Sequence, residues 1–397
     1  MRLVLIADVY PPLRSSGAVQ LRDLSIEFVK QGHEVTVLVA SPDLVEPWQI
    51  GLWHGVNVVR LKTPRTKDMG YVRRTIGEFL MPFAMLRNLR RSPLAQEKWD
   101  GVIWYSPSIF LGPIVKALKR RSSCRSYLII RDIFPEWAVD MGLMGRGLPY
   151  RFFKAVADYQ YSVADVIGIQ TPGNGNYFSN WIMRSSGRVE VLQNWLADAP
   201  VGRCSISVCT TPLAGRKIFV YAGNMGVAQG MGVMLDLVEQ FRNRLDVGFL
   251  FVGRGSDAQR MRIEAQNREL DNVVFFDEIE PSEIPALYQQ CHFGLISLDV
   301  RHKTHNIPGK FLSYMQAGLP VLASVNPGND IVDLIESTNV GRVCTDASAH
   351  TLKLLAEDLI NQLKDMEAFP ERCKALSDNL FSPKAAVRLI VSSLQSN

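Results

Sequence analysis

The stretch IFVYAGNMGVAQGMG, residues 218–232, joins a continuously apolar run to a glycine-rich turn. A second apolar run, Val247–Val252, leads into the turn GRGSD, residues 253–257. Continuous apolar runs are typical of parallel strands whose two faces are both covered by helices. Because the carboxyl ends of such strands meet at one edge of the sheet, we expect the two turns to lie side by side. Neither turn matches GxGxxG or GxxxxGK[ST], so the pair, rather than either motif, favours a bound nucleotide.

Similar apolar runs alternate with segments of helical period along the whole chain, which predicts an α/β fold with parallel sheets. Residues 196–216 lose this periodicity and gather Pro, Gly, Ser and Thr, as a linker would. We therefore expect two domains, 1–200 and 201–380, with a ligand cleft between the carboxyl ends of their sheets and a last helix, 381–397, packing back towards the first domain. The other predicted strands are Leu3–Ala7, Val35–Val39, Val56–Leu61, Val102–Tyr105, Tyr127–Ile130, Val166–Ile169, Val189–Leu192, Val273–Phe276, Phe293–Leu298 and Pro320–Ala323.

The composition is that of a globular protein, and we expect the protein to stay inside the cell. Of the 397 residues 47% are hydrophobic and 21% charged, which excludes disordered and collagen-like classes. The apolar runs are too short for a transmembrane helix, and MRLVLIADVYPP has too few apolar residues for a signal peptide. The six cysteines show no CxxC spacing, so we expect them to be reduced and structural, not part of a zinc ribbon or a disulfide scaffold.

Positive charge is concentrated in the first half of the chain. Residues 1–200 carry 25 Lys and Arg against 17 Asp and Glu, whereas residues 201–397 carry 19 against 22. Residues 51–125 hold 15 basic and 4 acidic side chains. This excess indicates an anionic partner, such as a membrane surface, a phosphate-bearing ligand or nucleic acid. The alternative is a basic face that only contacts solvent.

The segment YVRRTIGEFLMPFAMLRNLRR, residues 71–91, carries much of this charge beside apolar side chains. Such a basic amphipathic segment suits an anionic bilayer surface. The alternative is a helix of the core, and Pro82 predicts a break in it. The apolar residues are Phe79, Leu80, Phe83, Leu86 and Leu89, and the basic residues are Arg73, Arg74, Arg87, Arg90 and Arg91.

The stretch HKTHNIPGKFLSYMQAGLPVLAS, residues 302–324, places Lys310 in the first turn of a predicted helix. A cation there opposes the helix dipole unless an anion is bound. The alternative is a lysine that points into water. His302 and His305 are too few for a metal site, and the chain contains no DxD pair. We therefore expect no catalytic metal.

Taken together, the motifs resemble the retaining glycosyltransferases of family 4 over essentially the whole chain. The resemblance rests on the early YPP…G loop, the YAGN…G and VGRG turns, and three longer stretches: GHEVTVLV, residues 32–39; NVVFFDEIEPSEIPALYQQC, residues 272–291; and PGKFLSYMQAGLPVLA, residues 308–323. It implies the GT-B fold, two facing Rossmann-like domains with a cleft between them. The last stretch is similar to enzymes of bacterial surface polysaccharides, including N-acetyl-L-fucosamine transferases.

The resemblance implies a donor site in the second domain, with two departures from the family. The family's two glutamates correspond here to His305 and Ser313, and its Arg and Lys in the first glycine turn correspond to Asn224 and Gln229. Lys310 then remains as the cation for the donor diphosphate and is expected to be catalytic. The implied donor-binding residues are Gly17, Gly223, Asn224, Gly226, Gly253, Arg254, Gly255, Glu278, Ile279, His305, Pro308, Gly309, Lys310 and Phe311.

For the first domain the resemblance places Asp132, at the end of the strand Tyr127–Ile130, close to the reacting sugar. A carboxylate there could accept a hydrogen bond from a sugar hydroxyl or stabilise an oxocarbenium-like transition state. The alternative for Asp132 is a helix N-cap. The residues expected on the acceptor side or in the cleft are Arg14, Ser16, Arg131 and Asn194.

The expected reaction is transfer of a sugar, such as N-acetyl-L-fucosamine, from UDP to a polyprenyl-diphosphate-linked saccharide in O-antigen or capsule synthesis. Retaining members of the family are thought to use the departing phosphate oxygen as the base, so the resemblance implies retention without a protein base. We expect no cofactor. We expect a cytoplasmic protein on the inner face of the cell membrane, without a nucleic-acid partner. The alternatives are a UDP-sugar 2-epimerase of the same fold and a non-catalytic, membrane-recruited binding protein.

Overall fold

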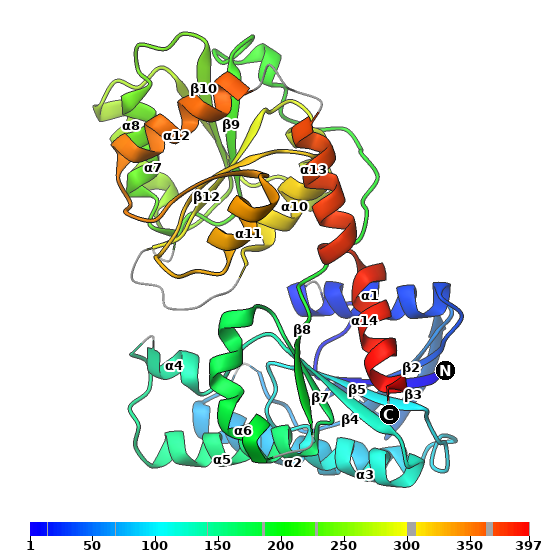
Figure 1. The fold of residues 1–397 in the computed structure, drawn as a ribbon. Coiled ribbons are helices and arrows are strands. Elements are labelled where there is room, and N and C mark those ends of the chain that lie inside the picture. Colours follow the sequence, from blue (N-terminus) through cyan, green and yellow to red (C-terminus); the bar gives the residue numbers. More distant parts are fainter. Residues whose placement is uncertain are drawn as a thin grey trace. The chain divides into compact units, whose positions relative to one another are not determined.

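The computed structural model describes all residues except 14, 68, 141, 185–186, 227–228, 300–306, 363–367 and 397. The chain forms two compact units. Unit 1 comprises Met1–Trp195 and Pro383–Asn397, and unit 2 comprises Leu196–Ser382 (Figure 1). All six cysteines are free thiols. No helix of the described residues is long and apolar enough to cross a membrane.

Unit 1 is built on an eight-stranded sheet of order β3-β4-β2-β1-β5-β6-β7-β8. All neighbours are parallel except the edge strand β3, which runs antiparallel to β4. The chain moves outward from β1 in one direction and then from β5 in the other, so the order reverses between β1 and β5. The strands are β1 (Arg2–Ala7), β2 (Glu34–Ser41), β3 (Trp48–Trp53), β4 (Val56–Lys62), β5 (Gly101–Ser106), β6 (Arg125–Ile130), β7 (Val166–Ile169) and β8 (Arg188–Val191).

Helices cover both faces of this sheet (Figure 1). The helices α2 (Tyr71–Leu89), α3 (Gly112–Ser122) and α5 (Leu148–Val163) bury one apolar face. The helices α1 (Ser16–Lys30) and α14 (Pro383–Gln395) bury the other. The last helix of the chain is thus part of unit 1. The remaining helices are α4 (Glu136–Asp140), the 3-10 helix η1 (Pro172–Phe178) and α6 (Ser179–Arg184).

Helix α2 runs unbroken through Pro82, so the predicted break is wrong. Proline removes one hydrogen bond and costs about 3 kcal/mol inside a helix. Met81, Met85 and Leu89 are buried on the same face of α2 and offset that loss. Leu89 therefore belongs to the core and not to the exposed apolar surface expected for it.

Unit 2 holds a six-stranded parallel sheet of order β11-β10-β9-β12-β13-β14. Its order reverses between β9 and β12, and ligands of open α/β sheets bind outside the carboxyl ends of the strands at such a point. The strands are β9 (Lys217–Ala222), β10 (Val247–Val252), β11 (Val273–Phe276), β12 (Phe293–Ser297), β13 (Val321–Ser324) and β14 (Gly341–Cys344). The α-helices are α7 (Gly232–Gln240), α8 (Ala258–Asn267), α9 (Ile284–Tyr288), α10 (Gly309–Ala317), α11 (Ile331–Thr338), α12 (Ala349–Gln362) and α13 (Ala368–Leu376).

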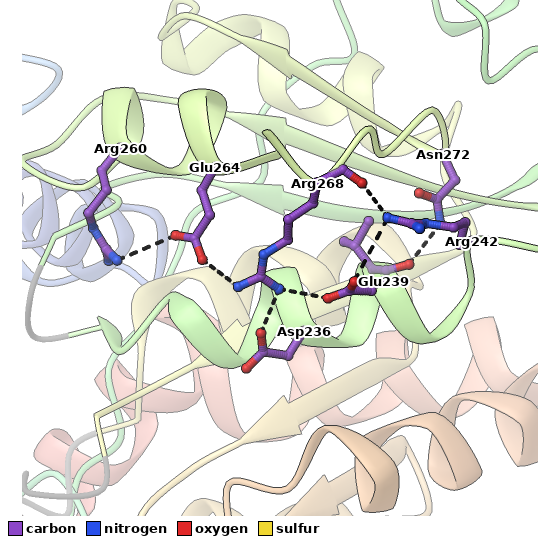
Figure 2. Close-up of polar contacts among 8 residues, drawn as sticks. Asp236, Glu239, Arg242, Arg260, Glu264, Arg268 and Asn272 are labelled. Atoms are coloured by element: carbon purple, nitrogen blue, oxygen red, sulfur yellow. Dashed lines mark hydrogen bonds and ion pairs between the residues drawn. The ribbon is translucent and has the colours of Figure 1, made fainter. Parts of the chain in front are cut away.

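A network of charged side chains joins α7 to α8 on the surface of unit 2 (Figure 2). Arg268 lies 2.8 Å from Asp236 and 2.9 Å from Glu239, and it also pairs with Glu264. Asn272 donates from Nδ2 to the Val238 carbonyl at 2.9 Å. Because Arg268 is shared among three carboxylates, this surface has a structural explanation and needs no anionic ligand.

The α/β class with parallel sheets is confirmed. The expected strands all appear within a residue or two of their predicted ends. Two strands were not predicted. The four central residues of β3, one of them a glycine, are all exposed, so its sequence lacks a buried face. β14 is only four residues long.

Candidate functional site

The glycine turns after β9 and β10 lie side by side and are joined by backbone hydrogen bonds. Met225 N donates to Arg254 O at 2.7 Å. Gly253 and Gly255 have φ values of +146° and +142°. A Cβ at Gly253 would lie 2.0 Å from Gly223 O, and one at Gly255 would lie 2.3 Å from Met225 O. Both positions therefore require glycine, because the two turns approach each other at backbone distance.

Lys310 brings a cation to the first of these turns from the start of α10. Its Nζ donates to Tyr221 Oη at 2.9 Å and lies 4.2 Å from the centre of the Tyr221 ring. The same Nζ would be 3.9 Å from a Cβ placed on Gly223. No carboxylate of a described residue lies within ion-pair distance. Burial lowers the pKa of Lys310 to about 8, so this position favours an anionic ligand that could restore the charge.

Tyr221, which sequence reasoning missed, holds Lys310 in place. Its hydroxyl accepts from Lys310 and donates to Asn224 O at 2.6 Å. Burial raises the pKa of the Tyr221 hydroxyl, so it remains a neutral donor. The signal in the sequence was a phenol in an otherwise apolar strand, directly before a glycine turn.

Asn224 and Gln229, at the positions where the resemblance would place two cations, bind each other. Asn224 Nδ2 donates to Gln229 Oε1 at 3.1 Å, and Gly226 N donates to the same oxygen at 3.0 Å. Ser297 Oγ, at the end of β12, donates to Gln229 O at 2.6 Å. The side-chain amides of Asn224 and Gln229 therefore close the turn without bringing positive charge to it. The Ser297 hydroxyl ties the turn to β12 through the Gln229 carbonyl.

The other residues expected to bind the donor differ in how exposed their side chains are. Arg254 and Glu278 form an exposed pair at 3.0 Å, and such pairs separate at little cost. Ile279 packs partly into the core. The side chain of Phe311 is fully buried, and its N–H donates to Pro308 O at 2.9 Å. The Phe311 side chain therefore anchors the first turn of α10 in the core.

The positions of the family's glutamates give no replacement carboxylate. Ser313 Oγ donates to Lys310 O within α10 at 3.0 Å. His305, like Arg14 in the first domain, lies outside the described residues. The described donor-site residues that come together are Gly223, Asn224, Gly226, Gly253, Gly255, Lys310 and the first turn of α10.

Arg131, in unit 1, is a buried cation held by backbone carbonyls. Its Nη1 donates to Leu192 O at 2.9 Å, and its guanidinium lies 4.7 Å from the centre of the Trp195 ring. Burial lowers the pKa of Arg131 to about 10. Its Nε has no hydrogen-bond partner among the described residues. Arg131 therefore fixes the segment after β8 and leaves one donor free.

Asp132 follows Arg131 at the carboxyl end of β6, with an exposed side chain. Partial burial raises the pKa of the Asp132 carboxyl, and the Arg131 charge opposes that rise. The structure gives no support to the capping alternative: α4 begins only at Glu136, and no hydrogen bond joins the Asp132 carboxylate to a described residue. The carboxylate is free to bind a ligand.

Gly17 lies against Tyr105 at the start of α1. A Cβ at Gly17 would be 3.2 Å from the Tyr105 ring, and Tyr105 Oη donates to Gln20 Oε1 at 3.0 Å. The N-cap of α1 is Ser15, which accepts from Ala18 N at 3.4 Å. Ser16 is exposed in the first turn.

At the carboxyl edge of the unit 1 sheet, several buried polar atoms have no hydrogen-bond partner in the described part of the chain. A buried polar atom without a partner costs about 1–3 kcal/mol, so a group of them indicates a hydrogen-bonding ligand or water. Nearby, Asn194 Oδ1 accepts weakly from Gln170 Nε2 at 3.5 Å. This edge suits a ligand rich in hydroxyl groups. The unpartnered atoms are Asp8 Oδ1, Ser106 Oγ, Arg131 Nε, Gln170 Oε1 and Thr171 Oγ1.

The sequence is similar to known glycosyltransferases. Residues 216–365 match the family model described as glycosyl transferases group 1. The putative colanic acid biosynthesis glycosyl transferase WcaI of Escherichia coli K12 is 25% identical over 346 residues, which cover 79% of this chain and 78% of that protein.

Two solved structures share the fold over the full length of both chains. WaaG, a glycosyltransferase involved in lipopolysaccharide biosynthesis, has a TM-score of 0.60 and 14% identity. HepE of Anabaena, in complex with UDP, has a TM-score of 0.62 and 14% identity. The fold of this chain is therefore of the GT-B type.

Proposed function

We propose that this chain is a retaining, metal-independent glycosyltransferase of surface-polysaccharide synthesis. It takes a sugar, an N-acetylated deoxyhexosamine such as N-acetyl-L-fucosamine, from UDP and passes it to a polyprenyl-diphosphate-linked saccharide. The glycosyl transferases group 1 model supports this proposal, because the matched residues 216–365 include both glycine turns and Lys310. The similarity to WcaI supports a role in polysaccharide synthesis.

The observation that carries the proposal is the placement of Lys310. It is a cation with no carboxylate of a described residue within ion-pair distance, 3.9 Å from the Cβ position of Gly223 and on the first turn of α10. The positive end of the α10 dipole and the Lys310 ammonium would both stabilise the charge that develops on the leaving diphosphate. Such stabilisation is strongest in the transition state, where that charge is largest.

Unit 1 would bind the acceptor. Asp132 is the proposed group that stabilises positive charge on the reacting sugar or holds one of its hydroxyls. The unpartnered polar atoms near Asp132 would bind the hydroxyls of the acceptor saccharide. The departing phosphate oxygen would take the acceptor proton, so the mechanism needs no protein base.

The exposed face of α2 would dock unit 1 on the inner face of the cell membrane. Tyr71, Val72 and Phe83 are exposed on this helix. Phe83 and Leu86 line a groove of about 380 Å³ together with Arg87, Arg90 and Arg91. Exposed apolar side chains beside arginines that pair with no carboxylate of a described residue suit anionic lipid headgroups.

A screen of UDP-sugars tests the proposal in two steps. A bound donor at 100 times its Kd adds about 2.7 kcal/mol of stability, so the right UDP-sugar should raise Tm. That donor is then incubated with lipid-linked saccharides in EDTA, and the product is identified by mass spectrometry. Stabilisation by no UDP-sugar would contradict the proposal, and epimerisation of the donor without acceptor would favour the 2-epimerase.

A further inference from the structure

A second concave site lies in unit 1, apart from the residues discussed above. It has a volume of about 410 Å³, which is within the usual range for small-molecule sites. The β3–β4 hairpin forms its floor, and the loop after β1 forms its rim. The lining residues are Tyr10, Pro11, Pro12, Gln49, Gly51, Leu52, Trp53, Val58 and Arg60.

Gly51 opens the floor of this pocket. In the hairpin Gly51 pairs with Val58, and Gln49 pairs with Arg60, so these four residues share one face of the sheet. A Cβ built on Gly51 meets no atom within 4 Å. Neither the backbone conformation nor crowding requires glycine there, and its effect is to leave the pocket open.

Two aromatic residues form the apolar part of the pocket. Tyr10 is buried, and its hydroxyl shares a hydrogen bond of 2.7 Å with Ser25. The Trp53 ring meets the Tyr10 ring edge to face, with centroids 6.3 Å apart. Trp53 is therefore held in place while it remains half-buried, as expected of an aromatic platform for a ligand.

Arg60 places a positive charge beside these rings, with no ion-pair partner among the described residues. Its Nη2 donates to the Pro11 carbonyl, and no carboxylate of a described residue lies within ion-pair distance of it. Asp23, the acid close to Tyr10, is already paired with Arg22 at 2.6 Å. The guanidinium retains further N–H donors, which suit a carboxylate.

We propose that this pocket binds an acidic pyranose residue of the saccharide acceptor, with the ring against Trp53 and the carboxylate on Arg60. The role assigned to the ligand rests on the proposed function, but the binding itself does not. Tyr10 lies two residues after Asp8 and its unpartnered oxygen, so their Cα atoms are at most about 7 Å apart. One loop would thus contact the acceptor at two places.

The lining residues favour this ligand over a nucleotide. They include no glycine-rich turn and no helix N-terminus, the features that cradle a diphosphate. They offer one guanidinium, one side-chain amide and a largely carbon surface, which match the single carboxylate, the hydroxyls and the C–H face of an acidic sugar.

The test titrates the full chain with methyl β-D-glucuronide and with methyl β-D-glucoside while the indole N–H signals are followed by NMR. The Trp53 signal is assigned from Trp53→Phe. We expect a saturable shift of the Trp53 signal with the glucuronide, and binding at least about tenfold weaker with the glucoside, since loss of a charge-assisted hydrogen bond costs about 1.5–3 kcal/mol. Inorganic phosphate alone should bind weakly.

Two variants separate the pocket from general effects. Gly51→Val fills the open space without strain and should abolish glucuronide binding with Tm unchanged or higher; Ile50→Val, on the opposite face of β3, should bind normally. Arg60→Gln should remove the preference for the glucuronide, and Arg65→Gln should not.

Equal binding of glucoside and glucuronide, tight binding of phosphate alone, or full glucuronide binding by Gly51→Val would each overturn this inference. UDP titration of the same samples keeps the two proposals apart. A shift of the Trp53 signal without UDP binding supports the pocket and contradicts the proposed function. UDP binding without a shift of the Trp53 signal supports the proposed function and contradicts the pocket.

Discussion

At the scale of single residues, one ammonium group, that of Lys310, brings positive charge to the first glycine turn. Asn224 and Gln229 are neutral and bind each other. Lys310 lies over the same turn, oriented by Tyr221 and paired with no carboxylate of a described residue. In the proposed mechanism Lys310 therefore supplies most of the side-chain charge at the donor diphosphate.

The pH dependence of UDP binding should follow the lowered pKa of Lys310. In the free protein the ammonium deprotonates near pH 8, whereas a bound diphosphate would raise that pKa. UDP affinity should therefore be constant below about pH 8 and fall by up to about tenfold per pH unit above it. Calorimetry between pH 7 and 9 measures this, with Lys310→Ala as the control that should show no such fall. A flat profile for the wild-type chain would contradict the assignment.

Replacement of Asp132 by Asn should slow turnover by roughly a hundredfold, since one preorganised electrostatic contact is worth about 10²–10³ in rate. UDP affinity should change little, because Asp132 is assigned to the sugar and not to the diphosphate. Steady-state kinetics and UDP calorimetry on the same sample test both parts. Asp43→Asn, an exposed acid paired with Arg65, is the control. Wild-type turnover in folded Asp132→Asn would remove Asp132 from the reaction.

At the scale of elements, α2 shows what could and could not be inferred from sequence. The basic and apolar composition of residues 71–91 indicated an amphipathic helix, and the structure exposes Phe79, Leu80 and Phe83 on it. The uninterrupted course through Pro82 depends on the fit of Met81 and Met85 into the core, a tertiary effect that local sequence does not encode. The same is true of β3, which forms by pairing with β4 rather than by burying an apolar face.

Changing Arg87, Arg90 and Arg91 together to Ser should weaken binding to anionic vesicles. A basic residue near an anionic surface contributes about 1 kcal/mol, so three correspond to roughly a hundredfold in affinity. Co-sedimentation with phosphatidylcholine vesicles, with and without phosphatidylglycerol, measures the effect. Arg203, Lys353 and Lys374 changed to Ser provide the control of equal charge. Undiminished vesicle binding by the first variant would reject α2 as the docking surface.

At the scale of the whole molecule, the sequence predicted the architecture better than the site. Strand periodicity and glycine turns indicated two parallel sheets because these signals are local. The support of Lys310 by Tyr221, 89 residues away in the sequence, is a tertiary contact that no local pattern contains. Likewise, the burial of the Phe311 side chain in the core follows from the packing of α10, which the motif around it does not encode.

The proposed chemistry predicts the stereochemical outcome of the complete reaction. If the departing phosphate oxygen serves as the base, acceptor and leaving group use the same face of the sugar. The new glycosidic bond should therefore have the anomeric configuration of the donor, which NMR coupling constants of the product reveal. The opposite configuration would exclude the retaining mechanism.

The central claim is that Lys310 holds the donor diphosphate, and calorimetric titration with UDP tests it most directly. Loss of a charge-assisted hydrogen bond worth about 1.5–3 kcal/mol should weaken UDP binding roughly ten- to a hundredfold in Lys310→Ala. Lys310→Arg should recover only part of the UDP affinity, because a planar guanidinium group is a poor substitute for a compact ammonium group. The exposed control Lys374→Ala should bind UDP like the wild type. Wild-type affinity in Lys310→Ala would contradict the account.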